Sequence, residues 1–248
     1  MLNIWKKKME KIKELVKKND LKHIAIIMDG NRRWAKERGL PSAVGHKKGV
    51  DALKATMRAC DDFGIKYLTV YAFSTENWNR SPEEVEALMR LLAEYLDRAY
   101  EELNGKNVKV NIIGERYMLS DELLKRIEKL EEDMKDNTGL VLNIALSYGG
   151  RQEIVNAAKK AAEMVKRGEI SEEEIDEKLL SSLMYTATQP DPDLIIRPSG
   201  EYRTSNFLLW QSAYSELWFS HVLWPAFSKR HLLEALNNYA ERNRRFGR

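Results

Sequence analysis

Cysteine is almost absent from the chain, since Cys60 is the single one among 248 residues. One cysteine excludes an internal disulfide framework and a metal site built from several thiolates, and it is typical of a protein that folds in a reducing cytoplasm. Because Cys60 lies in an amphipathic helical pattern, we expect it to be a small buried hydrophobe.

Long apolar runs and an excess of one charge are also lacking. No apolar stretch reaches the roughly 18 to 20 residues of a membrane span, and no signal-type apolar segment follows the lysine-rich N-terminus. The 41 basic and 38 acidic residues give a net charge of only +3. A charge balance this even does not favour a nucleic-acid partner. We expect a cytoplasmic protein whose membrane contact, if it has any, is peripheral.

The familiar nucleotide-binding signatures are missing as well. The chain has neither a Walker A loop nor a GxGxxG motif after a strand. The letters "DFG" at 62–64 lack the other kinase motifs, and Gly64 is better interpreted as the cap of a helix. A bound phosphate group would therefore not belong to a nucleotide.

Strand-like and helical patterns alternate along the whole chain. Five short runs rich in β-branched residues predict strands: HIAIIM from His23, KYLTVYAF from Lys66, NVKVNIIG from Asn107, LVLNIAL from Leu140 and DLIIR from Asp193. Because helical segments separate them, we expect an α/β fold with a mostly parallel central sheet flanked by helices. No linker or repeat divides residues 1–248, which predicts a single domain.

Two helices are predicted with particular boundaries. The first runs from Val50 to Phe63 and the second from Val85 to Leu103. Ser81 and Glu84 have the spacing of a capping box ahead of the second helix. Its apolar stripe suits core packing, or part of the wall of a hydrophobic tunnel.

The N-terminal segment 1–20 is an amphipathic helical pattern with many lysines. Trp5, Met9, Ile12 and Val16 share one side. Such a helix either packs on the domain or lies on an anionic membrane, and we favour packing.

Polar clusters follow four of the predicted strands at their carboxyl ends, where parallel sheets bind ligands. They contain Asp29 to Arg33, Ser74 to Arg80, Ser147 to Arg151 and Pro198 to Arg203. Arginine forks and glycine-rich turns suit phosphate oxygens, and one or two carboxylates can hold Mg²⁺ against a phosphate. The sequence therefore predicts a diphosphate site with Mg²⁺.

Several of these features also have simpler structural explanations. Asp29-Gly30-Asn31 on its own suits a turn, and His46 suits the start of a helix. The glycines before Arg151 suit a tight turn, with an anion role for Arg151 only secondary. His221 and His231 suit packing or the surface, and Trp210, Trp218 and Trp224 suit the core or an interface.

Four blocks in order resemble one family across nearly the whole chain. They are "HIAIIMDGNRRWAKERGLPSAVGHKKG", "YAFSTENWNR", "NIALSYGGR" and "DPDLIIRPSGEYRTSNFLLWQSAYSELWFSHVLWPAF". They resemble the signature blocks of the cis-prenyltransferases, the undecaprenyl diphosphate synthase family. The resemblance implies condensation of isopentenyl diphosphate with an allylic diphosphate, usually farnesyl diphosphate, to form Z double bonds with Mg²⁺. It also implies a homodimer of α/β subunits with a hydrophobic tunnel.

The resemblance implies roles residue by residue. Asp29 matches the metal-binding catalytic aspartate, Asn77 a proposed proton acceptor, and Glu216 a second metal-associated carboxylate near the dimer interface. The family positions that bind the allylic diphosphate or assist the isopentenyl group are matched by Gly30, Asn31, Arg32, Arg33, Trp34 and His46. The family's mobile loop, which closes over the substrates, is matched by Ser74, Thr75, Glu76, Trp78 and Arg80. The clamp for isopentenyl diphosphate matches Arg197, Arg203, Thr204 and Ser205.

One position departs from the family pattern. Ser42 stands where an arginine near the allylic diphosphate is common. The loss of one charge-assisted contact costs about 1.5 to 3 kcal/mol, unless Arg32, Arg38 or Lys47 replaces it.

Three functions remain open at this point: an active cis-prenyltransferase, a non-catalytic partner subunit, and an anion- or RNA-binding module. The family's key residues are retained, which argues against the second, and the charge balance argues against the third. Product length stays open between a long carrier lipid for the cell wall, which we favour, and a short Z-prenyl chain.

Overall fold

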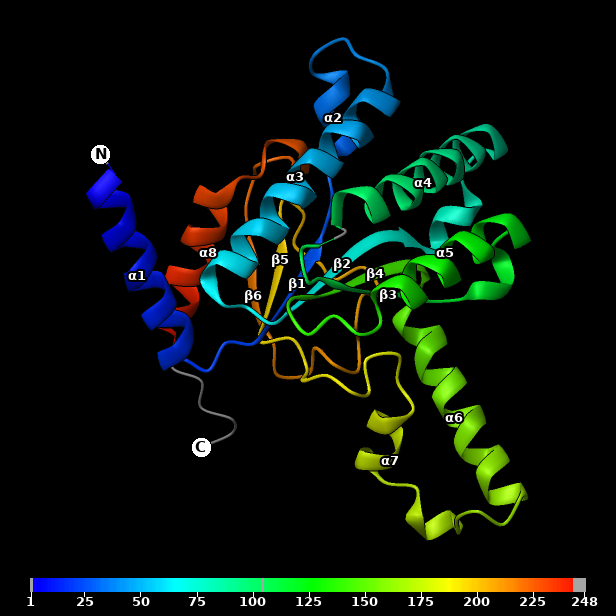
Figure 1. Cartoon of the computed structure of the whole chain (residues 1–248). Helices are drawn as coiled ribbons and strands as arrows, with labels where there is room; N and C mark the ends of the chain where they lie inside the picture. Colours follow the sequence, from blue (N-terminus) through cyan, green and yellow to red (C-terminus); the bar gives the residue numbers. More distant parts are fainter. Residues whose placement is uncertain (1, 104, 243–248) are drawn as a thin grey trace.

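The core of the fold is one six-stranded sheet, and all of its paired strands are parallel (Figure 1). The computed structural model describes residues 2–103 and 105–242. The strands are β1 (His23–Ile27), β2 (Tyr67–Ser74), β3 (Lys109–Ile113), β4 (Val141–Tyr148), β5 (Leu194–Arg197) and β6 (Glu216–Phe219). Their order across the sheet is β3-β4-β2-β1-β5-β6. The predicted parallel α/β sheet is confirmed, and β6 is a strand that the sequence did not reveal.

The helices connect and cover the strands. They are α1 (Leu2–Lys18), α2 (Asn31–Lys36), α3 (Ser42–Phe63), α4 (Pro82–Leu103), α5 (Asp121–Met134), α6 (Gly150–Lys166), α7 (Glu177–Ser182) and α8 (Lys229–Glu241). Short 3₁₀ turns follow β2 at η1 (Thr75–Asn79) and precede α8 at η4 (Trp224–Ala226). Figure 1 shows α1, α3 and α8 side by side, and the three helices contact one another.

The sheet buries its two faces unequally. Alternate residues of a strand point to opposite faces, so Ile24 and Ile26 lie in a large cluster with side chains of α1, α3, α4, α5 and α8. Ala25 and Ile27 face a small cluster, which the segment after β5 covers with Phe207 and Leu208. The buried run of β1 thus contributes to both layers.

Helix α3 begins eight residues before the predicted Val50, at Ser42, and ends as predicted at Gly64, which has a left-handed φ of 81°. Gly45 and Gly49 weaken the helical pattern of the sequence, because glycine is a poor helix former. They are needed for packing: a Cβ at Gly45 would lie 2.2 Å from the carbonyl oxygen of Asn31. The close contact of α2 with α3 therefore explains the two glycines.

Helix α1 packs on the domain. Ile12 and Val16 are buried in the large cluster, and α1 contacts α3 and α8. The side chains of Trp5 and Met9 lie outside the described residues. Among the described residues, the structure contains no helix with the length and apolarity needed to cross a bilayer.

Helix α4 is held at its start by Ser81, whose Oγ accepts the N–H of Glu84 at 3.3 Å. Leu96 is buried in the core. Val85, Leu88, Met89 and Leu92, earlier on the same stripe, are only partly buried against it. The first half of α4 thus leaves apolar surface available beside the carboxyl end of β2.

Candidate active site

A cavity of about 1430 Å³ opens where β1, β2 and β5 end. Its walls come from the ends of these strands and the loops that follow them, from α2 and the start of α3, from Leu88 of α4, and from Arg151 at the start of α6. The predicted site residues that line it are Asp29, Gly30, Asn31, Arg32, Arg33, His46, Ser74, Glu76, Asn77, Arg80, Arg197, Arg203, Thr204 and Ser205. The structure therefore brings the polar clusters of β1, β2 and β5 together, and Arg151 joins them from the start of α6.

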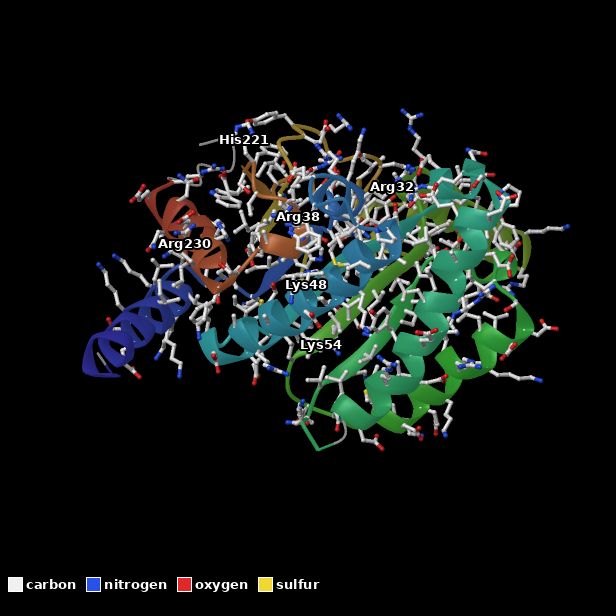
Figure 2. All side chains as sticks on the ribbon, turned by 90° about the horizontal axis from the view of Figure 1, so that it is seen from above. Arg32, Arg38, Lys48, Lys54, His221 and Arg230 are labelled. Carbon is white, nitrogen blue, oxygen red and sulfur yellow. The ribbon has the colours of Figure 1, made fainter. Side chains whose placement is uncertain are left out.

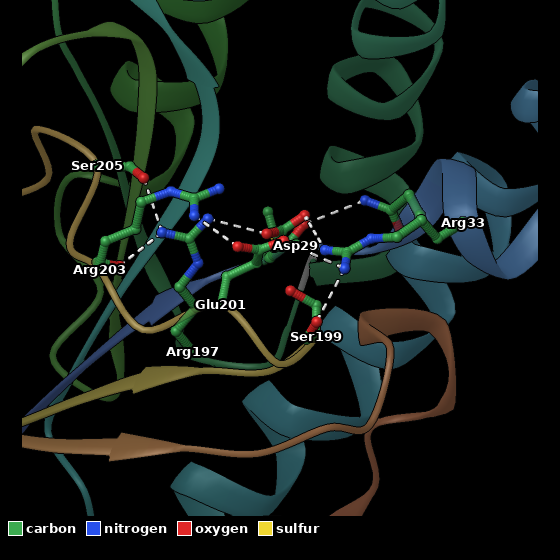
Figure 3. A network of polar contacts seen from close by, with 9 residues as sticks. Asp29, Arg33, Arg197, Ser199, Glu201, Arg203 and Ser205 are labelled. Carbon is green, nitrogen blue, oxygen red and sulfur yellow. Dashed lines mark hydrogen bonds and ion pairs between the residues drawn. The ribbon is translucent and has the colours of Figure 1, made fainter.

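Asp29 lies between two arginines at the mouth of the cavity, where Arg33, Arg197 and Arg203 form what we call the arginine rim (Figure 3). Its Oδ2 accepts a hydrogen bond from Nη2 of Arg197 at 2.9 Å, and its Oδ1 lies 3.3 Å from Nη2 of Arg33. The Arg197 side chain is 5 % exposed and that of Asp29 28 % exposed. A buried guanidinium needs such a partner, because an unpaired buried charge is costly.

Arg197 is fixed from several sides. Its Nη1 donates to the carbonyl oxygen of Arg203 at 2.5 Å and to Oγ of Ser205 at 2.7 Å. Its Nε is buried without a hydrogen-bond partner. The guanidinium thus orders the loop after β5, and its buried Nε–H is left without an acceptor.

A second carboxylate, Glu201, joins the same network. It lies 3.4 Å from Nη1 of Arg33 and accepts a hydrogen bond from Nη1 of Arg203 at 2.5 Å. Nη1 of Arg33 also donates to the carbonyl oxygen of Ser199 at 2.9 Å. Figure 3 shows Asp29 and Glu201 alternating with the three guanidinium groups. Three cations around two carboxylates leave the rim suited to an additional anion.

The arginines act on the acidity of Asp29. Burial raises the pKa of its carboxyl group, but the hydrogen bond from Arg197 and the charges of Arg197 and Arg33 lower it more, so that this pKa lies below its ordinary value. Asp29 is therefore ionised at neutral pH, as a metal ligand must be.

A second charged cluster lies on the α4 side of the cavity. Glu84 accepts hydrogen bonds from Nη1 of Arg32 at 3.1 Å and from Nη1 of Arg80 at 2.9 Å. Burial lowers the pKa of the adjacent His46 to about 4, and the charges of Arg80 and Arg32 contribute while Glu84 opposes them. The His46 imidazole is therefore neutral at pH 7 and can donate or accept a hydrogen bond there.

Figure 2 places these cations on the molecule. Arg32 of α2 lies toward α4, whereas Arg230 of α8 lies on the far side, beyond Arg38 and Lys48. Arg38 stacks over Trp34 at 4.4 Å from the ring centroid and does not line the cavity. Lys36, one helical turn after Arg32, does line it.

The comparison with known proteins decides the family. Residues 27–247 match the family model described as putative undecaprenyl diphosphate synthase. The chain belongs to this family. An isoprenyl transferase of Clostridium tetani is 52% identical over 257 aligned residues, which cover 100% of this chain and 99% of that protein. The isoprenyl transferase of Bacillus subtilis is 51% identical and covers 95% of this chain and 91% of its own length.

Solved structures agree with the sequence relatives. Lavandulyl diphosphate synthase from Lavandula x intermedia, in complex with dimethylallyl diphosphate, has a TM-score of 0.88 and 39% identity, covering 91% of this chain and 98% of that one. A probable undecaprenyl diphosphate synthase from Campylobacter jejuni has a TM-score of 0.78 and 35% identity, covering 92% and 99%. As a member of the undecaprenyl diphosphate synthase family, the chain is a prenyltransferase.

Four residues that the family resemblance implicates do not line the cavity: Trp34, Thr75, Trp78 and Glu216. Trp34 belongs to α2, and Thr75 and Trp78 belong to η1, elements that supply other residues of the cavity wall. Nε1 of Trp78 donates to Oγ of Ser147 at 2.9 Å. Glu216 is at the other end of the sheet. It pairs in register with Leu194, which pairs with Ile24, and its Oε2 accepts a 2.6 Å hydrogen bond from Nη1 of Arg242. Within one chain the structure does not bring Glu216 and Asp29 together.

The donor set at Asp29 fits a magnesium ion shared with a substrate. Among the described residues, no group of three or more histidine, cysteine, aspartate or glutamate side chains could enclose a metal. Mg²⁺ does not need such a cage, since it commonly binds through one or two carboxylates, water and phosphate oxygens. Asp29 supplies an ionised carboxylate at the mouth of a cavity lined with arginines.

Several residues of the site were not predicted. Lys36, Tyr71, Glu84 and Asn206 line the cavity or bind residues that do. The helical spacing from Arg32 to Lys36 could have indicated Lys36. Glu84 was interpreted only as a capping residue. The i,i+4 spacing could have indicated its pair with Arg80, but its pair with Arg32 depends on the approach of α2 to α4, which no local pattern reveals.

Proposed function

We propose that this prenyltransferase condenses isopentenyl diphosphate with an allylic diphosphate, farnesyl diphosphate in the first place, to form a Z-polyprenyl diphosphate for the carrier lipid of the cell wall. The observation that carries the proposal is the composition of the cavity. Arginines surround Asp29 at its rim, and Met28, Ala72, Phe73 and Leu88 line it as well. A diphosphate suits the rim, and a hydrocarbon chain suits the apolar wall.

We assign Arg32, Arg33, His46 and Arg80, with the backbone of Gly30 and Asn31, to the diphosphate of the allylic substrate. Arg197, Arg203, Thr204 and Ser205 are assigned to isopentenyl diphosphate, because Arg197 ends β5 and the other three lie on the loop that follows, on the other side of Asp29 from Arg33. Two diphosphates held on opposite sides of Asp29 would orient the reacting carbons toward each other. We assign supporting roles to Trp34 of α2, to Ser74 at the end of β2, and to Thr75, Glu76 and Trp78 of η1.

The reaction breaks the allylic C–O bond, and the double bond of isopentenyl diphosphate attacks the carbon that results. The rim arginines stabilise the negative charge that develops on the departing diphosphate. Magnesium, when bound by Asp29 and the diphosphate, supplies Lewis-acid stabilisation of the same charge. Asn77 is assigned to the acceptance of the proton that is then released. In the structure its Oδ1 accepts the N–H of Ser74 at 3.1 Å, so its amide is oriented.

We infer a homodimer, because Glu216 can reach a metal at Asp29 only from a second copy of the chain. A short-chain Z-prenyl product is the second candidate. The 0.88 TM-score with lavandulyl diphosphate synthase in complex with dimethylallyl diphosphate favours it. A partner subunit without activity fits less well, since Asp29, Asn77 and Arg203 are all present at the cavity.

The test is incorporation of labelled isopentenyl diphosphate with farnesyl, geranyl or dimethylallyl diphosphate, with and without Mg²⁺, followed by separation of the products by length. Magnesium-dependent long Z chains support the proposal. Products that stop after one or two additions support the short-chain candidate. No incorporation with any primer contradicts both and favours the partner-subunit function.

A further inference from the structure

The turn η1, which carries Asn77, is joined to two other loops by one side chain. Nδ2 of Asn206 donates to Oε1 of Glu76 at 2.8 Å. Oδ1 of Asn206 accepts the backbone N–H of Arg151, at the start of α6, at 2.9 Å. The backbone carbonyl oxygen of Asn206 accepts the N–H of Gly150 at 2.7 Å. The segments that follow β2, β4 and β5 therefore meet at Asn206.

The orientation of the Asn206 amide is fixed by its partners. A backbone N–H can only donate and an ionised carboxylate can only accept, so Oδ1 must face Arg151 and Nδ2 must face Glu76. Burial raises the pKa of Glu76, but hydrogen bonds from its own backbone N–H and from Asn206 are among those that lower it more, so this carboxyl group is ionised at neutral pH. The contact to η1 is thus a charge-assisted hydrogen bond.

The local backbone is shaped for this contact. Asn206 has a left-handed φ of 63°, a conformation that asparagine tolerates better than most residues. A Cβ at Gly149 would lie 2.6 Å from Oγ1 of Thr75 and 2.9 Å from Nδ2 of Asn206, so only glycine allows η1 to approach so closely.

Asn206 also connects η1 with the arginine rim. Its neighbour Ser205 accepts the hydrogen bond from Nη1 of Arg197, and Arg197 binds Asp29. Glu76 and Asn77 are adjacent in the same short turn. The position of Asn77 is therefore linked through Glu76 and Asn206 to the loop that holds Arg203, Thr204 and Ser205.

We propose that Asn206 is a positioning residue, which docks η1 through Glu76 and so holds Asn77 over the loop that carries Arg203 to Ser205. The inference rests on the proposed function, because it gives Asn77 a place in the reaction. A residue that only capped α6 would need Oδ1 alone. A positioning residue needs the Nδ2 donor as well.

The substitution Asn206→Asp separates these two roles. Aspartate keeps an oxygen that accepts the N–H of Arg151, and it places a second oxygen against the Glu76 carboxylate, where like charges repel. The pair Asn206→Asp with Glu76→Gln restores a donor and an acceptor with the direction of the hydrogen bond reversed. Asn19→Asp is the matched control. It makes the same chemical change just after α1, where Nδ2 of Asn19 donates to the carbonyl oxygen of Leu15 at 2.8 Å.

Two readouts are measured on the full chain. The first is the rate of tryptic cleavage after Arg80 without substrate, identified by mass spectrometry, which reports release of η1. The second is kcat and KM for isopentenyl diphosphate. We expect Asn206→Asp to be cleaved about tenfold faster at Arg80 and to lose about tenfold in kcat, with a smaller change in KM. The double variant should recover both values to within about threefold of the wild type, and Asn19→Asp should match the wild type.

The inference would be overturned if Asn206→Asp had the same cleavage rate at Arg80 and the same kcat as the wild type. It would also be overturned if the double variant recovered neither the cleavage rate nor kcat. If the wild type incorporates nothing, the proposed function fails, and the cleavage rates still decide whether Asn206 docks η1. If Asn206→Asp does not fold, as judged by circular dichroism, Glu76→Ala at an exposed position must give the faster cleavage. Unchanged cleavage in that variant overturns the inference.

Discussion

Oδ2 of Asp29 accepts a 2.9 Å hydrogen bond from Nη2 of Arg197, a residue 168 positions later in the chain. The two residues meet because β1 and β5 are neighbours in the sheet and end at the same edge. Each stabilises the other's charge in a partly buried place. A diphosphate that enters with a cation can therefore find both an anionic and a cationic partner at one point.

Arg197→Lys should weaken the site for isopentenyl diphosphate. The guanidinium makes separate hydrogen bonds to Asp29, to the carbonyl oxygen of Arg203 and to Ser205, and a single ammonium group cannot reproduce this planar geometry. We expect KM for isopentenyl diphosphate to rise about 10- to 100-fold. Arg230→Lys, at an exposed position of α8, is the control. Steady-state kinetics in which both variants behave alike would contradict the assignment.

Ser42→Arg should strengthen binding of the allylic diphosphate. Ser42 is the first residue of α3 and lines the cavity with Lys36 and His46. An arginine there adds a cation to the side assigned to that diphosphate, and we expect the KM of farnesyl diphosphate to fall about tenfold. Ser42→Gln, which is long but uncharged, should not have this effect. A KM that stays the same or rises in Ser42→Arg would show that the cavity already holds enough positive charge there.

His23 should make the fold sensitive to acid. Its Nδ1 lies 2.7 Å from the carbonyl oxygen of Pro190 and its Nε2 lies 2.7 Å from Oγ1 of Thr69. Burial lowers the pKa of His23 from 6.5 to about 4, although the hydrogen bond to Pro190 and the charge of Asp193 oppose this. Between these two values the unfolded chain binds a proton that the folded chain does not bind. The free energy of unfolding should therefore fall as the pH drops from 6.5 toward 4, by about 3 kcal/mol.

Urea unfolding at pH 7 and at pH 4.5 measures this dependence. The variant His23→Gln should show a smaller loss of stability between the two values than the wild type. An identical loss in both proteins would assign the acid sensitivity to other groups.

Glu216 should act across a dimer. The variants Asp29→Asn and Glu216→Gln should each be inactive alone. When they are co-expressed, some dimers contain one subunit of each kind. If Asp29 and Glu216 of one site come from different subunits, one of the two sites in such a mixed dimer has both native carboxylates. Random pairing then restores about a quarter of the wild-type activity. If both carboxylates were needed from the same chain, the mixture would stay inactive. Analytical ultracentrifugation of each variant confirms that dimers form.

The sequence predicted most of the sheet for a simple reason. The runs that became β1, β2, β3, β4 and β5 are rich in β-branched residues and stand between helical patterns. The four residues of β6 begin with a charged side chain and are only partly buried. Its pairing with β5 is a tertiary contact, which no local pattern predicts. For the same reason the sequence could not place Glu216 at the end of the sheet away from Asp29.

In the candidate site, too, some features follow from local sequence patterns and others depend on tertiary contacts. The clusters after β1, β2 and β5 could be expected together, because parallel strands end at one edge. The contacts between the loops could not be predicted from the sequence. Glu84 binds Arg32, and Asn206 binds Glu76, only because α4 and the segment after β5 approach residues far away in the sequence.

The most direct test of the account is calorimetric titration of the protein with inorganic diphosphate, with and without Mg²⁺, in the wild type and in Asp29→Asn. If Asp29 and the rim arginines hold a magnesium diphosphate, the wild type binds more tightly with Mg²⁺, by about tenfold or more, and Asp29→Asn loses this difference while it still binds diphosphate through the arginines. An equal effect of Mg²⁺ in both proteins, or no binding in the wild type, would contradict the central claim.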